Sequence, residues 1–598
     1  SPMSVDERSG YGQAIPLGGP ITNEEESWLC ASNLIPFAIL NLIYQNSNLY
    51  LSKVNMDNKH CLRENGRWKT YGTYKLIMWA WMMNEVSVVF SPIDISDGGF
   101  YVHGTIQLLA VIFVGIPLVY SEICIAQYTN CSIVTMWNFL PILRSVGYGS
   151  YYFIFLKTIY TMVLASWYLE YTFYSVRDPP PWFTCDDFND TKCMIKRINV
   201  SVYQHCIEAQ ALFDTDCGMK TGIIIASCTS GAVLFILSIK REKFIQAIVK
   251  LLAIYVCIVV FILFWVVLSS SGTWYATRII INWYNFDTIN CITAFTRGLL
   301  TCGAGCGIIA FLSRDVSFRS PATMTSVTVP LCSVVITASL ALVIFGGIKT
   351  MSYYHGEEEN VLEVGESLFF SAFASVTETL MYFDQLPIWT FLWLSAIFLC
   401  LFIHLWILYL FFQESMFGTV KIARKYSKLS SILLIALICA LSSPFYCSDL
   451  AAVLNDVVHV LQITNMVFFS LALYWFYGFK NHSVDIIFMI GVKPSLYWTI
   501  SWVLSPIITF SFLSISLRCD EIVLFIFIAL YFCIIILSMI VQIKNYYYYD
   551  DLRNLFHPTP NWGPRDRVLL RSRKMFVPEI MTREFLYRQV RIRSANSG

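Results

Sequence analysis

The stretch Cys291–Arg314, "CITAFTRGLLTCGAGCGIIAFLSR", decides the fold, because it is a long apolar segment with a break at its centre. Gly303, Gly305 and Gly307 stand at alternate positions, and each glycine in a helix interior costs about 1 kcal/mol relative to alanine. One interpretation is close helix packing through small residues. The other is a segment that unwinds at mid-membrane, which is tolerated only where the backbone is buried in protein or lines a cavity. The pattern favours the unwound segment.

The composition indicates a membrane protein. Of the 598 residues, 56% are hydrophobic and only 14% are charged, whereas charged residues make up about 25% of a typical soluble domain. The net charge of +1 gives no reason to expect a nucleic acid as partner. The apolar residues form long runs, so we expect an all-α polytopic protein with twelve transmembrane helices, each able to cross about 30 Å of hydrocarbon. These spans are expected at 74–93, 101–125, 149–174, 221–239, 245–268, 289–312, 323–348, 388–412, 429–446, 457–478, 496–516 and 522–544.

The first span is interrupted as well. Its core, Trp79–Phe90 "WAWMMNEVSVVF", carries Glu85 near the middle. A charge at the bilayer centre costs at least about 2.5–3.5 kcal/mol, so such groups are usually paired and functional. The first and sixth spans are five spans apart, and a pair of broken segments in corresponding halves is typical of a transporter binding site near the membrane midplane.

The charge distribution predicts the orientation of the chain. Basic side chains follow the fourth, sixth and eighth spans, at Lys240, Arg241, Lys243, Arg314, Arg319, Lys421, Arg424, Lys425 and Lys428. These junctions and both termini are therefore expected on the cytoplasmic side. We expect a cytoplasmic region at 1–70, a transporter domain at 71–545 and a cytoplasmic tail at 546–598. The segment 28–44 is too polar for a span and is predicted to lie at the membrane interface or bind a partner, and no cleavable signal peptide is recognised.

The long segment 176–220 is expected outside the cell. It carries Cys185 and Cys193 together with two N-x-S/T sequons, at Asn189 and Asn199. Paired cysteines and glycosylation acceptors both belong in an oxidising exterior. The segment therefore supports the orientation that the basic residues predict.

Several kinds of catalytic motif are missing from the sequence. It has no H-E-x-x-H motif and no P-loop. The "HGEEEN" stretch at 355–360 is better explained as a solvated acidic loop than as a metal site. The "GAGCG" stretch at 303–307 has neither the spacing nor the βαβ context of a dinucleotide fingerprint. We therefore predict no enzyme activity, no cofactor and no metal centre.

Several motifs together carry a family resemblance. They lie at 115–129 "GIPLVYSEICIAQYT", 181–193 "PWFTCDDFNDTKC", 299–307 "LLTCGAGCG", 474–506 "YWFYGFKNHSVDIIFMIGVKPSLYWTISWVLSP" and 557–564 "HPTPNWGP". Over about residues 63–565 the chain resembles the sodium- and chloride-coupled neurotransmitter and amino-acid symporters.

The resemblance implies a fold, ligands and a location. It implies a bundle of twelve helices, with spans 1–5 and 6–10 as inverted repeats and helices 1 and 6 broken at mid-membrane. It also implies an extracellular disulfide between Cys185 and Cys193, and a multi-pass location in the plasma membrane. The resemblance implies sodium and chloride as coupling ions and a small-molecule solute as substrate, with an amino acid preferred.

The first span departs from the family motif A-V-[GD]-L-G-N-V-W-R-F-P. When the motif is anchored on Phe90 and the glycine pair that follows, it falls on Trp81–Ser91. The substrate-facing position is then Met83, the unwound glycine is Glu85 and the sodium-binding Asn is Val86. None of these three side chains matches its counterpart.

Other positions of the family's site are partly retained. The sodium-binding Asp-Ser pair of span 8 maps to Ile407 and Leu408, whose side chains offer no oxygen to a hard cation. Glu122 matches an acid that braces the unwound region, and Arg297 replaces the glutamine of the chloride site. The candidate substrate positions are Met83, Glu85, Tyr160, Leu300, Thr301, Gly303 and Gly305. The candidate ion-site positions are Val86, Arg297, Thr301, Ser333, Thr337, Ile407 and Leu408.

Two charges thus stand where the family keeps ions. We expect Glu85 and Arg297 to form an intramembrane ion pair that replaces bound sodium and chloride, since arginine suits bidentate pairing with a carboxylate. The alternative is that each charge has a different partner or faces a hydrated vestibule. A separation of more than about 6 Å between the two side chains would refute the pair, since such a pair requires hydrogen-bonding distance.

Two functions remain open at this point. The first is a divergent transporter of an amino acid or related small solute, with altered or lost sodium and chloride coupling. The second is a transport-inactive relative that acts as a receptor, chaperone or partner subunit. Met83 lacks the carboxylate that would hold a monoamine, so an amino acid is preferred. Fold does not fix function, but the family resemblance places the transporter first.

Overall fold

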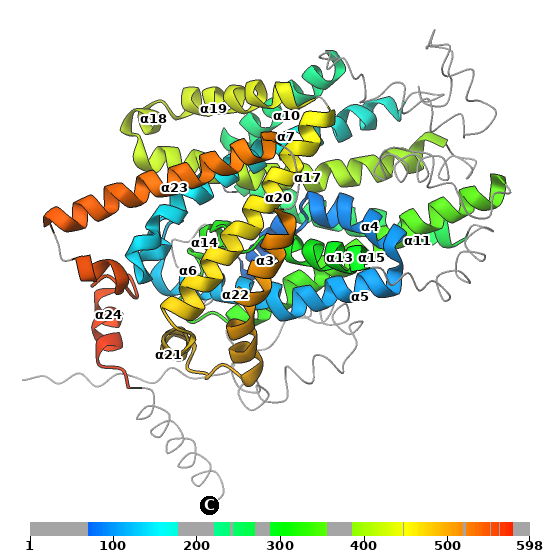
Figure 1. Ribbon diagram of the computed structural model, residues 1–598. Coiled ribbons are helices and arrows are strands. Elements are labelled where there is room, and N and C mark those ends of the chain that lie inside the picture. Colours follow the sequence, from blue (N-terminus) through cyan, green and yellow to red (C-terminus); the bar gives the residue numbers. More distant parts are fainter. Residues whose placement is uncertain are drawn as a thin grey trace, which may run out of the picture. The chain divides into compact units, whose positions relative to one another are not determined.

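The computed structural model describes residues 68, 70–176, 221–239, 243–269, 288–355, 386–446, 448–517, 522–549, 552–560 and 562–577. Every regular element in these ranges is a helix, and the longest are apolar enough to cross a membrane (Figure 1). The expected all-α polytopic class is confirmed. Residues 177–220 of the predicted loop at 176–220, with its cysteines and sequons, and the segment 28–44 lie outside the described residues.

Ten of the expected spans form helices that pass as membrane spans by length and composition. Four of them contain a short π-helical or 3-10 segment within the run, and π-bulges are common at functional sites. Their elements are α5 (Phe100–Ala110), η4 (Val111–Gly115) and α6 (Ile116–Thr129); η6 (Pro141–Leu143) and α7 (Arg144–Tyr174); α10 (Thr221–Ile239); α11 (Lys243–Leu268); α15 (Ala322–His355); α17 (Leu386–Thr419); α19 (Ser427–Ser442) and η9 (Ser443–Tyr446); α20 (Ser448–Ser470) and η10 (Leu471–Phe476); α22 (Leu496–Ser516); and α23 (Ile522–Tyr549).

The remaining two expected spans are broken, as predicted. The first consists of α3 (Tyr71–Met82), followed by η3 (Val86–Phe90) and α4 (Ser91–Gly98), and its two parts are bent by 70°. The sixth consists of α13 (Thr288–Thr301) and α14 (Ile308–Ser313), with six residues between them. Both breaks are lined by buried residues, so the irregular backbone is enclosed by protein.

Helix α7 lies against many of the other helices. It packs against α17, α23, α10, α20 and α19. Most of its central residues are buried, among them Lys157 and Tyr160. A charged side chain on such a helix has no route to water along the helix surface, so it must find its partner inside the bundle.

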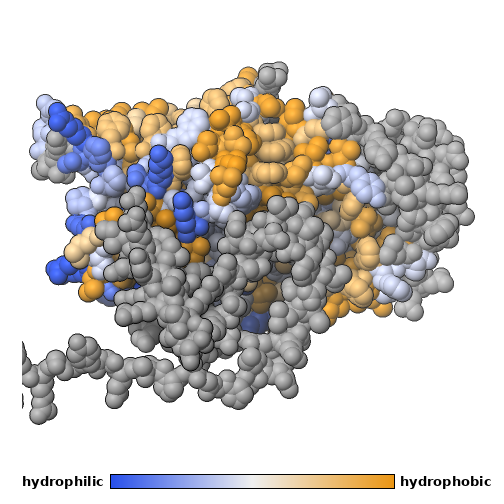
Figure 2. Space-filling view, turned by 90° about the horizontal axis from the view of Figure 1, so that it is seen from below, coloured by the Kyte–Doolittle hydropathy of each residue, from blue (hydrophilic) through white to orange (hydrophobic). Residues whose placement is uncertain are grey.

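The peripheral helices carry an apolar outer surface. Large exposed hydrophobic side chains concentrate on α11, α19, α22 and α23, for example Phe261, Leu433, Phe510 and Leu537. Figure 2 shows hydrophobic residues across much of the described surface and hydrophilic residues gathered toward one end. Because a soluble domain rarely leaves so much apolar surface exposed, this distribution fits contact with lipid.

The segment after α23 folds back onto helix ends. Helix α24 (Arg567–Lys574) places Arg573 2.8 Å from Asp485 of α21 (Phe479–Ile490), and the same carboxylate accepts a hydrogen bond from Tyr128 of α6. Burial by itself would lower the pKa of the Arg573 guanidinium, but Asp485 and Tyr128 outweigh this effect and raise that pKa. The indole of Trp562 donates to the Tyr477 hydroxyl, so the segment is held at two points.

Candidate functional site

The break in span 1 is organised by Asn84. Helix α3 ends at Met82, and the Asn84 side-chain oxygen then accepts the backbone N–H of Ser87 at 3.1 Å. Its amide nitrogen donates across the bundle to the carbonyls of Leu300 and Thr301, at 3.4 and 3.3 Å. Asn84 therefore holds the second half of span 1 and ties it to the end of α13.

The break in span 6 depends on its glycines. Gly303, Gly305 and Gly307 have φ values of +56°, +81° and +89°, a conformation that other residues rarely adopt. A Cβ on Gly303 would lie 2.7 Å from the Trp81 indole nitrogen, and one on Gly305 would lie 2.9 Å from the Cα of Met466. The prediction of an unwound midpoint is confirmed. The alternative, close packing of a continuous helix through small residues, does not explain these glycines, because their φ values are positive.

Glu122 holds the unwound segment from span 2. Its carboxylate accepts the backbone N–H groups of Gly305 at 2.7 Å and Ala310 at 3.2 Å. These amides belong to the break and to the first turn of α14, where backbone N–H groups have no partner within the helix. The acid is fully buried and therefore acts as a fixed acceptor between two spans.

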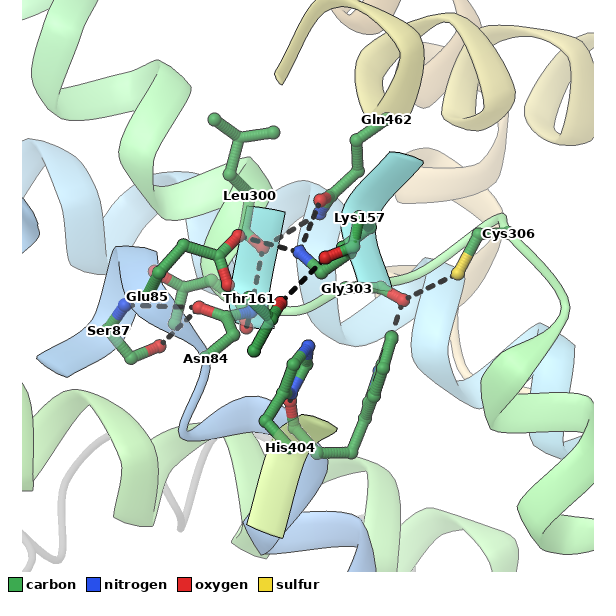
Figure 3. A network of polar contacts seen from close by, with 12 residues as sticks. Asn84, Glu85, Ser87, Lys157, Thr161, Leu300, Gly303, Cys306, His404 and Gln462 are labelled. Carbon is green, nitrogen blue, oxygen red and sulfur yellow. Dashed lines mark hydrogen bonds and ion pairs between the residues drawn. The ribbon is translucent and has the colours of Figure 1, made fainter. Parts of the chain in front are cut away.

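The partner of Glu85 is Lys157 of α7. The lysine Nζ lies 2.7 Å from the Glu85 Oε1, and both side chains are 0% exposed. The same nitrogen lies 3.3 Å from the Gln462 side-chain oxygen, and the Gln462 amide donates to the Leu300 carbonyl at 2.8 Å. Figure 3 shows the resulting chain of contacts across spans 1, 3, 6 and 10.

The expected pair between Glu85 and Arg297 is wrong. The Arg297 Nε instead lies 2.6 Å from the Asp94 Oδ2 of α4, and these side chains are 16% and 15% exposed. Arginine therefore pairs near the surface of the bundle, where water lowers the cost of its charge, and the fully buried carboxylate takes a lysine. The alternative, in which each charge has its own partner, is what the structure adopts.

Sequence reasoning missed Lys157, although a signal was present. It is a single lysine within the apolar run Tyr151–Tyr174, and it precedes the predicted site residue Tyr160 by three positions. Residues three apart on a helix lie on the same face, so Lys157 had to face the site that Tyr160 was expected to face. An intramembrane lysine is by itself a candidate functional residue.

Trp81 and His404 enclose the other side of the pair. The His404 Nδ1 lies 3.0 Å from the Trp81 carbonyl, and its ring stacks on the Trp81 indole with centroids 4.4 Å apart. The indole N–H donates to the Gly303 carbonyl at 3.3 Å, and the Lys157 Nζ lies 6.0 Å from the centre of the indole ring. Aromatic and imidazole rings thus fill the space between spans 1 and 8 beside the break.

The predicted hydroxyl positions contact the backbone of the chain itself. The Ser333 hydroxyl donates to the Met82 carbonyl at 3.3 Å, and the Thr337 hydroxyl donates to the Ser87 carbonyl at 2.9 Å. The Thr301 hydroxyl donates to the Arg297 carbonyl at 2.8 Å, within its own helix. Two span-7 hydroxyls therefore satisfy carbonyls next to the span-1 break.

The remaining predicted positions are apolar and buried. Val86 and Leu300 form a small cluster with Ile463 and Val467 of α20. The other four lie in the main apolar core at 3% exposure or less: Met83, Tyr160, Ile407 and Leu408. Among the described residues, no group of three or more His, Cys, Asp or Glu side chains is arranged to hold a metal ion.

The fold and the two breaks define a class, namely a polytopic all-α membrane protein whose first and sixth spans are interrupted. The chain belongs to the sodium:neurotransmitter symporter family, whose family model matches residues 96–549. It is 24% identical to the sodium-dependent serotonin transporter of Drosophila melanogaster, over 67% of this chain and 68% of that protein.

Two other relatives match over shorter stretches. The chain is 29% identical to the creatine transporter of Torpedo marmorata over 17% of this chain and 18% of that protein. It is 27% identical to the human sodium- and chloride-dependent neutral and basic amino acid transporter B(0+) over 24% of this chain and 23% of that protein. Each of these two matches covers less than a quarter of the relative's length.

Proposed function

We propose that this protein is a small-solute transporter of the symporter family in which a fixed internal cation, the Lys157 ammonium, takes the place of bound sodium. The contact that carries the proposal is the 2.7 Å ion pair between Lys157 and Glu85 at the break of span 1. A positive charge that belongs to the chain then neutralises the carboxylate whenever no solute is bound. Solute movement would then proceed without sodium.

The oxygen atoms around the break support this proposal. A hard cation needs several oxygen ligands at once. The Met82 carbonyl already accepts from Ser87 at 2.6 Å, the Leu300 carbonyl accepts from Gln462, and the Trp81 carbonyl faces His404. The residues present therefore do not fit a sodium ion.

The contacts favour a register one residue later than the one first assigned. With Pro92 on the last residue of the family motif, the substrate-facing position becomes Asn84 and the sodium-binding Asn becomes Ser87. Asn84 indeed contacts the span-6 break, whereas Met83 lies in the apolar core. Ser87 offers one hydroxyl, which donates to Met82, so sodium loses its side-chain ligand in either register.

Chloride coupling is also expected to be lost. Arg297 stands in place of the family's glutamine, and its guanidinium is neutralised by Asp94 at 2.6 Å. An anion at this position would have to compete with a carboxylate already hydrogen-bonded to the arginine. The two coupling ions are thus each replaced by a charge pair within the chain.

An amino acid or a related small solute is the proposed substrate. The relatives named above are described as transporters of serotonin, creatine, and neutral and basic amino acids. The Asn84 side chain at the break is neutral and offers both a donor and an acceptor. It therefore gives no reason to prefer a cationic monoamine.

A transport-inactive role is the second candidate, and one observation favours it. The carbonyls at the end of α13 are bonded to Asn84 and Gln462, and all the groups of this contact are buried. A solute would have to displace these internal hydrogen bonds. If it cannot, the protein would act as a receptor, chaperone or partner subunit.

Uptake in expressing cells separates these functions. Labelled amino acids, creatine and taurine would be offered in sodium chloride buffer and in buffer with choline replacing sodium and gluconate replacing chloride, with surface delivery measured by biotinylation. We expect uptake that is equal in the two buffers. Uptake that requires sodium would contradict the proposal, and no uptake by surface-delivered protein would favour the second candidate.

A further inference from the structure

We propose that Lys157 and Glu85 together recognise a zwitterionic solute, the lysine taking its carboxylate and the glutamate taking its ammonium. The inference rests on the proposed function, because it assigns the substrate class of the same site. The ion pair seen in the structure is then the closed state of the site, in which the two charges satisfy each other. A solute that carries both charges can insert between them without leaving either one unpaired.

The electrostatics of the break support a zwitterion over a single charge. Glu85 and Lys157 are both fully buried and their charges cancel. A cationic amine could pair with Glu85 only by leaving the Lys157 ammonium without its counter-ion, and an anionic acid would isolate Glu85 in the same way. An uncompensated buried charge is strongly unfavourable. A zwitterion replaces one internal pair by two pairs and keeps the site neutral.

One atom of the pair is already available to a ligand. The Glu85 Oε1 contacts Lys157, whereas the buried Oε2 has no hydrogen-bond partner among the described residues. A buried carboxylate oxygen without a donor is costly, and ligand ammonium N–H groups would satisfy it. The unpaired oxygen therefore points to a donor-bearing ligand rather than to a purely structural ion pair.

The neighbours of the pair suit the two ends of an amino acid. Gln462 reaches Lys157 with its side-chain oxygen at 3.3 Å and can release it when a carboxylate arrives. Asn84 lies next to Glu85 in the chain, and its side-chain oxygen, which accepts from Ser87, is an acceptor of the kind that a solute ammonium needs. Both side chains bridge to the Leu300 carbonyl, so solute binding between spans 1 and 3 would also act on span 6.

Other titratable groups do not supply these two contacts. His404 of α17 and His459 of α20 lie within electrostatic range of both Glu85 and Lys157. His404 is engaged with Trp81, and the ring of His459 makes an edge contact with Phe90 at 6.0 Å. Glu85 and Lys157 are the oppositely charged groups that meet at the break itself.

A set of matched ligands tests the inference on the full-length wild-type protein. Purified protein in detergent would be titrated with L-leucine, with its decarboxylated amine 3-methylbutylamine and with its deaminated acid 4-methylpentanoic acid. L-phenylalanine, phenethylamine and 3-phenylpropanoic acid form a second set. Binding would be read from the shift in thermal unfolding temperature, which rises when a ligand binds the folded state.

We expect at least one of the two amino acids to bind about ten- to a hundredfold more tightly than both of its analogues, since each analogue loses a hydrogen bond to a charged group. Equal shifts with the amine or the acid would overturn the inference. The absence of a shift with either amino acid would overturn it as well.

Variants provide the residue-level control. Lys157→Met alone leaves a buried carboxylate unpaired and can prevent folding, so the double variant Glu85→Gln with Lys157→Met is the informative one. Replacing both members of a buried ion pair is often tolerated. We expect the double variant to fold and to lose the preference for the amino acid over its analogues. A double variant that retained this preference would contradict the assignment.

Performing the titrations in sodium and in choline buffers separates this inference from the proposed function. An amino-acid shift that appears only with sodium would refute sodium independence while leaving recognition by the charge pair intact. A shift that is sodium-independent but equal for amine, acid and amino acid would support the fixed cation and overturn zwitterion recognition.

Discussion

At the scale of the residue, the site is governed by how buried charges are neutralised. Glu85 forms an ion pair with Lys157, and both side chains are fully buried. Arg297 forms an ion pair with Asp94 nearer to the surface of the bundle. The ammonium is compact and strongly solvated in water, whereas guanidinium is larger and suited to forked contacts. A compact ammonium lies beside the break, and in the proposed function its charge takes the place of the charge that sodium would carry.

The stability of the pair should be strongly non-additive. Lys157→Met is expected to destabilise the protein by about 3–5 kcal/mol, because it leaves Glu85 buried and unpaired. Adding Glu85→Gln should recover most of this loss, since no charge then remains at the break. Thermal unfolding of the two single variants and the double variant measures the coupling. Additive effects of the two substitutions would contradict a direct pair.

The charges of the site could be located from the sequence, but their partners could not. Glu85 and Arg297 are recognisable in the sequence as costly charges within apolar runs, so the sequence locates one charged group in span 1 and one in span 6. Pairing depends on the distance between helices far apart in sequence, and Lys157 is 72 positions from Glu85. The contact between spans 1 and 6 depends on packing in the same way, because one residue of rotation decides whether Met83 or Asn84 meets span 6.

At the scale of the element, the two broken helices support each other. Trp81 of α3 packs on Gly303, and Asn84 bonds to the end of α13, while Glu122 fixes the amides beyond the break. The breaks themselves were predictable, because three alternate glycines and an acid in an apolar run are local signals. The contacts between the breaks are tertiary and carry no such signal.

Substituting the break glycines should therefore be costly. In the Gly303→Ala variant, residue 303 would have to keep the left-handed φ of +56°. Its new Cβ would lie 2.7 Å from the Trp81 indole nitrogen. We expect a loss of about 1–3 kcal/mol or more from backbone strain alone. Thermal unfolding in detergent would measure it.

Gly104 provides the matched control. It lies within α5, and a Cβ there meets nothing within 4 Å. Gly104→Ala should stabilise the protein by up to about 1 kcal/mol, because alanine is the better helix former. If both alanine variants changed stability by similar amounts, the special role of the span-6 break would be refuted.

At the scale of the whole molecule, the segment after α23 ties helix ends that are far apart in sequence. Arg573 contacts Asp485, which in turn accepts hydrogen bonds from Tyr128 and Tyr477. Helix α6 also packs against α14, the helix that follows the break in span 6. The attachment therefore connects the last described helix, α24, to the span that holds this break. The motif near 557–564 predicted that this segment would be family-like, but its docking partner had no sequence signal.

Releasing this segment should expose it to proteases. Arg573→Ala removes the charge that pairs with Asp485, whereas Arg571→Ala, on the same helix, is the matched control. We expect trypsin to cut the Arg573 variant several-fold faster within 562–577, since cleavage follows local opening. The Arg571 variant should be cut at the wild-type rate apart from its own lost site. Equal rates for the two variants would show that the ion pair does not hold the segment.

The central claim is that the chain's own ammonium replaces sodium. Saturable binding of radiolabelled sodium to purified full-length protein tests it most directly. We expect none for the wild type, because the Lys157 ammonium already neutralises Glu85 and the carbonyls beside it are hydrogen-bonded within the chain. Saturable sodium binding by the wild type that Glu85→Gln abolishes would contradict the account.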